Sequence, residues 1–164
     1  MALTPDSRAL LLPSAKTAYL TLMRTALAFL LLASPAAAWE FSATPICTLT
    51  NTSDEGTLTV TYDASLPEYT ITITLPDGVW PDDPGFAMAF ADTMPIGIQT
   101  DRHTRSADGR SLTVTDTGFG NVLNGLEFNS RAYAMSGDTT VGVSLDGISP
   151  AIKAFRDCPA ANLA

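Results

Sequence analysis

Apolar and polar residues alternate along most of the chain after residue 38, which is the period of a β-strand with one buried face. The segment 57–62, TLTVTY, puts Leu58, Val60 and Tyr62 on one face and threonines on the other. The segment 69–75, YTITITL, repeats the pattern after a turn-like link. The two segments therefore predict an antiparallel hairpin with threonine on its solvent side.

The same alternation predicts strands in six more places. They are 46–50, 86–90, 96–100, 111–115, 131–135 and 139–145. In the first of these, Cys47 and Leu49 share a face. The polar segment 101–110 predicts a connection with a turn at Asp108 and Gly109.

Two segments have helical spacing instead. A short internal helix is predicted by Val122, Leu123, Leu126 and Phe128, although Gly125 weakens it. The whole pattern predicts a mainly β fold: an antiparallel β-sandwich or partly closed barrel of seven or eight short strands, with that helix and a C-terminal helix.

The C-terminal helix has a clear start in the sequence. Ser149 is a suitable N-cap and Pro150 a suitable first helical residue. The apolar face then carries Ala151, Phe155 and Cys158, with Ile152 beside it. Pro159 is predicted to end the helix.

Residues 23–38 break the alternation. Arg24 precedes an apolar run that ends before the small residues 36–38, the layout of a secretory signal peptide. Cleavage is predicted between Ala38 and Trp39. The run is too short for a membrane-spanning helix, which needs roughly 20 apolar residues. The alternative, an alanine- and leucine-rich helix packed on the domain, is weakened because the run lacks the polar face that a surface helix has.

This leader divides the chain. We expect Met23 to be the true initiator and residues 1–22 to be an extension upstream of it. The signal peptide is then 23–38, and 39–164 form a single β-rich domain without a transmembrane anchor. The signal peptide predicts export to the periplasm.

Charge and cysteine content narrow the partners. Six Arg or Lys and sixteen Asp or Glu follow residue 38, a net charge of −10, which excludes a basic face for nucleic acid or anionic lipid and leaves a cationic partner open. In an oxidising compartment Cys47 and Cys158 are expected to form a disulfide. No C-x-x-C redox pair is present.

Candidate chemistry is sparse. His103, the single histidine, with Asp101 nearby, is a possible general base, although such a residue is more often a polar loop residue. Asp82 and Asp83 are candidates for a metal site or paired carboxylates, but their flanking prolines favour a turn.

The sequence lacks the motifs of several common enzyme classes, namely nucleotide-binding proteins, serine hydrolases and zinc metalloproteases. The glycines at 118–125 have neither a dinucleotide-binding nor a P-loop spacing, and no G-x-S-x-G or His-Glu-x-x-His motif occurs. No cofactor is expected. Trp39 and Trp80 are possible partner-binding residues, or lids on a small core.

The mature start WEFSATPICTL, the central segment 100–129 and the ending SLDGISPAIKAFRDCP resemble a family of small exported proteins of alphaproteobacteria. More distantly, Leu145, Gly147 and Ala151 are similar to a pattern of the invasion-associated locus B family of periplasmic proteins. The resemblance implies a Gram-negative periplasm and carries over no catalytic residues.

These observations favour a non-enzymatic envelope protein, a monomeric β-domain that binds another protein or an envelope component. An envelope hydrolase using carboxylates and His103, and a carrier of a small ligand, are the alternatives. The sequence alone does not separate them.

The export prediction has a direct measurement. Intact mass spectrometry of the unreduced chain from the periplasm of a Gram-negative host should give a chain that starts at Trp39 and is two hydrogens lighter than the dithiol. A full-length, reduced, cytosolic chain would contradict both the signal peptide and the disulfide.

Overall fold

The structure is a computed structural model that describes residues 39–161, with side chains to residue 158. The predicted extension and signal peptide, residues 1–38, lie outside the described residues. The described chain has ten strands and two helices. The strands are β1 Glu40–Ser42, β2 Cys47–Ser53, β3 Gly56–Asp63, β4 Glu68–Thr74, β5 Phe86–Ala91, β6 Ile96–Thr100, β7 His103–Arg105, β8 Ser111–Asp116, β9 Arg131–Ser136 and β10 Thr139–Ser144; the helices are α2 Gly120–Phe128 and α3 Ser149–Ala161.

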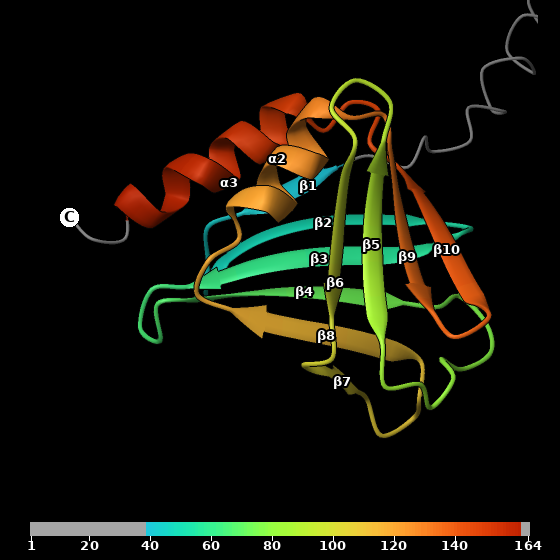
Figure 1. The fold of residues 1–164 in the computed structure, drawn as a ribbon. Coiled ribbons are helices and arrows are strands. Elements are labelled where there is room, and N and C mark those ends of the chain that lie inside the picture. Colours follow the sequence, from blue (N-terminus) through green and yellow to red (C-terminus); the bar gives the residue numbers. More distant parts are fainter. Residues whose placement is uncertain (1–38, 162–164) are drawn as a thin grey trace, which may run out of the picture. The chain divides into compact units, whose positions relative to one another are not determined.

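The strands form two antiparallel sheets. Sheet A has six strands in the order β1-β2-β3-β4-β8-β7, and sheet B has four in the order β10-β9-β5-β6. The strands of sheet B run across those of sheet A (Figure 1). The prediction of a mainly β sandwich with a C-terminal helix is confirmed, and the sheets do not close into a barrel.

The register of sheet A follows the alternation in the sequence. Val60 lies opposite Ile71, and both are buried, whereas Thr61 lies opposite Thr70 on the outer face. The hydroxyls of that threonine pair lie 2.7 Å apart and hydrogen-bond to each other. The predicted hairpin is therefore confirmed, with apolar residues inside and threonine outside.

Two short strands were not predicted. β1 and β7 have three residues each and form the two edges of sheet A. β7 lies within the segment 101–110, which was expected to be only a connection. Three residues are too few to show alternation, so these strands depend on the hydrogen-bonding edges of β2 and β8.

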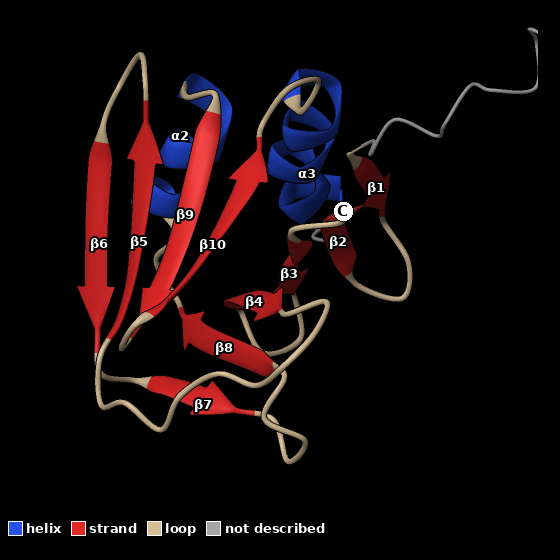
Figure 2. Cartoon of the chain, turned by 90° about the vertical axis from the view of Figure 1, so that its right-hand side faces the viewer, coloured by secondary structure: helices blue, strands red, loops and turns tan. Residues whose placement is uncertain are grey.

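The helices fill one end of the space between the sheets. α2 contacts β5, β6 and β9 of sheet B, α3 contacts β1 and β2 of sheet A, and the helices contact each other. Figure 2 shows both helices on the inner side of sheet B. Elsewhere β10 contacts β3 directly, so the sheets meet along one side and are separated by the helices at the other. Neither helix has the length and apolar character that a membrane crossing by residues 39–161 would need.

The bounds of α3 differ from the prediction at both ends. The helix starts at Ser149 because the carbonyl of Ile148 accepts a hydrogen bond from the N–H of Ile152 (2.9 Å), so Ile148, not Ser149, precedes the helix. The helix also continues past Pro159 to Ala161. Proline at this position removes one N–H donor, and the helical path continues for two more residues.

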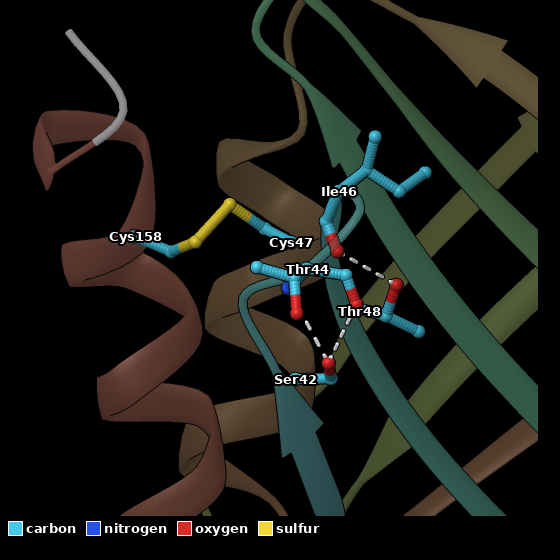
Figure 3. The surroundings of a disulfide bond; sticks show 6 residues. All are labelled: Ser42, Thr44, Ile46, Cys47, Thr48 and Cys158. Atoms are coloured by element: carbon cyan, nitrogen blue, oxygen red, sulfur yellow. Dashed lines mark hydrogen bonds between the residues drawn. A yellow bond between two sulfur atoms is a disulfide. The ribbon is translucent and has the colours of Figure 1, made fainter.

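The predicted disulfide is confirmed. Cys47 at the start of β2 is bonded to Cys158 of α3 (Figure 3), with Cα atoms 6.2 Å apart. Both cysteines are buried. At the end of β1, the hydroxyl of Ser42 donates to the carbonyl of Thr44 (2.9 Å) in the link to β2. The disulfide between Cys47 and Cys158 therefore fastens the last helix to the beginning of sheet A.

Gly125 is required by a close approach of α2 to β5. A Cβ atom at this position would lie 2.3 Å from Cδ2 of Phe90, whose ring is buried. The glycine that weakens the predicted helix thus allows the helix to lie against sheet B. The gain in packing offsets its low helix propensity.

We expect Gly125→Ala to lower the free energy of unfolding by about 1–3 kcal/mol, because the added methyl overpacks the contact with Phe90. Gly120→Ala is the matched control in the same helix, since a Cβ there meets no atom within 4 Å. The control should change stability by about 0 to 1 kcal/mol in the favourable direction. Urea denaturation of both variants measures the difference, and equal effects would contradict the proposed contact.

Candidate binding site

A cavity of about 130 Å³ lies between the two sheets, next to the start of α2, and it is partly open to solvent. We call it the inter-sheet pocket. Its lining comes from β4, β5, β6 and β8 and from the segment that enters α2, elements that Figure 1 shows facing one another. Its apolar lining residues are Ile71, Phe86, Met88, Ile98, Val114, Phe119 and Val122.

Strand register explains why these residues converge. Ile71 of β4 lies opposite Val114 of β8 in sheet A. Met88 of β5 lies opposite Ile98 of β6 in sheet B. Each pair occupies inward positions, so the two pairs approach the pocket from opposite sheets. Ile98 is the only one of the four that is half-buried rather than buried, which places the exposed side of the pocket near β6.

The polar part of the lining is built around an ion pair. Arg102, in the link between β6 and β7, donates from Nη2 to Oδ2 of Asp116 at 2.5 Å. Oδ1 of Asp116 accepts the backbone N–H groups of Thr117 (2.7 Å) and Gly118 (3.3 Å). Exposed pairs of this kind contribute little to stability. Their effect here is to orient the guanidinium and to shape the turn that leads into α2.

These contacts lower the pKa of Asp116 below its ordinary value of 3.8. The hydrogen bond from Arg102 is the largest cause, followed by the backbone N–H groups of Gly118 and Thr117. All three stabilise the carboxylate relative to the protonated acid. Above pH 3.8 the polar side of the pocket therefore holds an ionised carboxylate paired with the guanidinium of Arg102.

The structure does not join His103 and Asp101 into a catalytic pair. His103 lies on β7, and its ring lies 6.0 Å from that of Phe86 between centroids. Its Nδ1 atom is buried and has no hydrogen-bond partner within the described chain. Asp101 is exposed, and no hydrogen bond between these two side chains is found in residues 39–161. His103 also lies outside the lining of the inter-sheet pocket.

The other candidates lie apart from the pocket. Asp82 is exposed, and Oδ1 of Asp83 accepts the N–H of Gly85 (2.8 Å), a local turn contact. Within residues 39–158 no three His, Cys, Asp or Glu side chains gather in a way that could hold a metal ion. Trp39 and Trp80 are both buried in the core.

The two indoles are hydrogen-bonded to the backbone. Nε1 of Trp39 donates to the carbonyl of Ser144, and Nε1 of Trp80 donates to that of Ile73, each at 3.2 Å. The backbone N–H of Trp80 also donates to the carbonyl of Gly109 (2.8 Å). Both indoles are therefore buried side chains whose N–H groups have backbone acceptors.

The main residues of the pocket were not singled out from the sequence. Arg102 and Asp116 are separated along the chain and meet because the chain turns from β6 through β7 into β8. The only local signal is the pair of glycines 118 and 120 in the segment that enters α2, whose spacing served above only to exclude a nucleotide-binding motif. Nothing in that segment points to a partner at Arg102.

The chain matches no protein-family model, no curated protein and no solved structure in the three comparisons made. The resemblance to exported alphaproteobacterial proteins therefore stays a prediction. A functional interpretation depends on the geometry of the described domain.

The ion pair gives a prediction about titration. Arg102→Gln should raise the pKa of Asp116 toward 3.8, because the largest cause of its lowering is removed, whereas Arg105→Gln, whose parent guanidinium donates to the carbonyl of Trp80, should leave it unchanged. Carboxyl ¹³C chemical shifts against pH measure both. Since the folded pKa is lowered, the contribution of Asp116 to stability is present above pH 3.8 and is lost as the pH falls through the folded pKa.

Proposed function

We propose that this chain is an exported, periplasmic binding domain, without enzymatic activity, that holds an apolar group of an envelope protein or envelope component in the inter-sheet pocket. The observation that carries the proposal is the pocket itself: an apolar cavity, partly open, with the Arg102–Asp116 pair in its lining. Protein interiors are normally close-packed. A concave apolar site with a few fixed polar groups is the usual form of a binding site.

The volume limits what the pocket can accept. At about 130 Å³ it is smaller than the roughly 300–1,000 Å³ of pockets that enclose a drug-sized ligand. It is close to the volume of an apolar cavity that admits a benzene-sized molecule. One side chain or one short acyl branch therefore fits, while the rest of the partner stays outside. This favours a protein or envelope component over a fully enclosed small ligand.

The disulfide is consistent with export, because such bonds persist in oxidising compartments. Hydrolysis through His103 and Asp101 stays a prediction. No hydrogen bond joins these two side chains in residues 39–161, so the geometry gives it no support. Unchanged turnover in His103→Ala and Asp101→Asn would remove that alternative. The proposed binding function makes no use of either residue.

Two glycines at the start of α2, Gly118 just before the helix and Gly120 as its first residue, provide a matched test. Gly118 lines the pocket, and a Cβ there meets no atom within 4 Å; Gly120 has the same free space but lies outside the lining. Gly118→Phe should therefore cover or fill the pocket, and Gly120→Phe should add the same ring elsewhere. Thermal unfolding of both variants checks that they fold.

The probe is benzene, followed by ¹³C-methyl NMR. We expect saturable shifts at the methyl groups of Ile98, Val114 and Val122 in the parent domain and in Gly120→Phe. In Gly118→Phe the affinity should fall at least tenfold. Absence of saturable shifts in the parent domain, or equal affinity in the two variants, would overturn the proposed function.

A further inference from the structure

The free edge of sheet B is the part of the molecule that the proposed function leaves unused. β6 is the last strand of that sheet, and its one neighbour is β5. On its other side, no strand of the described chain pairs with it. An unpaired edge presents backbone N–H and C=O groups that accept a further strand.

β6 is the least protected of the four sheet edges. β1 and β7 have only three residues each, and β10 contacts β3 of the other sheet. β6 has five residues, IGIQT, without a charge or a proline. Natural edge strands are usually shortened, covered, or protected by lysine, proline or a bulge. β6 has none of these within its five residues.

The same strand forms a wall of the inter-sheet pocket. Ile98, Gln99 and Thr100 of β6 all line it. A strand added beside β6 would lie about 4.8 Å away and would turn every second side chain toward the inner side of the sheet. One such side chain would then lie over the pocket, whose volume suits a single apolar group. Backbone pairing and side-chain insertion are thus compatible at one place.

We infer that β6 is a docking edge: an extended segment of a partner protein pairs with Ile96–Thr100 as a fifth strand of sheet B and inserts one apolar side chain into the inter-sheet pocket. The inference rests on the proposed function and specifies its partner as an extended peptide. In strand addition, main-chain hydrogen bonds supply affinity and pockets for alternate side chains supply specificity.

Charge favours a basic peptide. The chain after residue 38 has sixteen acidic and six basic residues. Asp101, next to the end of β6, is exposed, whereas the charge of the neighbouring Arg102 is paired with Asp116. Long-range attraction then increases the association rate of a cationic segment. The occupant is therefore an extended segment with one apolar side chain and an excess of Lys or Arg.

The test uses phage-displayed octapeptides selected on the oxidised domain and then synthesised. N-methylation of successive backbone amides should alternate in effect: a loss of at least tenfold at amides that face β6, and little change at the amides between them. Amide NMR shifts should concentrate on residues 96–100, with β10 as an unperturbed internal control.

Insertion is tested by a double-mutant cycle. Replacing the apolar residue of the peptide by Ala should lower the affinity at least tenfold for the parent domain and for Gly120→Phe, and much less for Gly118→Phe. Coupling of this kind is expected only if the side chain enters the pocket.

The remaining outcomes separate the two proposals. If benzene binds the pocket but N-methylation has no alternating effect, or no peptide is selected, strand addition is wrong and the proposed function stands. If the domain is a dimer whose β6 amides are protected by a second copy, the occupant is that copy and the peptide proposal is wrong. If Gly118→Phe affects neither probe, both proposals fail.

Discussion

The fold depends on the burial of α3 against β1 and β2, where the Cys47–Cys158 bond fastens it. The inner face of β2 carries Cys47 and Leu49, which are fully buried, and α3 is the element that contacts this strand from the inside. The bond closes a loop of 111 residues, for which chain-entropy arguments give about 4–5 kcal/mol of stabilisation. It therefore connects the first long strand to the last helix of the described domain.

The position of α2 follows from that of α3. Nε of Arg156 in α3 forms an ion pair with Glu127 in α2 at 2.8 Å, and Nη2 of the same side chain donates to Asn124 at 2.8 Å. On its other side α2 lies against Phe90 through Gly125. The two helices thus keep the sheets apart at one end of the sandwich. The first turn of α2 then forms part of the lining of the inter-sheet pocket.

The position of the two helices accounts for the pocket, and the strand order of sheet B accounts for the free edge of β6. Because the helices separate the sheets, the inward side chains of β4 and β8 do not fully fill the space between these two strands and β5 and β6 of sheet B. Because sheet B ends at β6, the same space borders an unpaired strand. An unpaired strand edge therefore lies next to a pocket for an apolar side chain. Peptide recognition by strand addition uses this combination.

The alternation of apolar and polar residues by itself determined most strands, the buried and exposed faces of β3 and β4, and the mainly β class, because these depend on the local period of the chain. The helical face of α3 and the pairing of the two cysteines were also determined by sequence. Only the tertiary structure decided the three-residue strands β1 and β7, the role of Gly125, and the meeting of Arg102 with Asp116. Each of these depends on which strands become neighbours and how closely the layers pack, and no local pattern encodes contacts between residues that are distant along the chain.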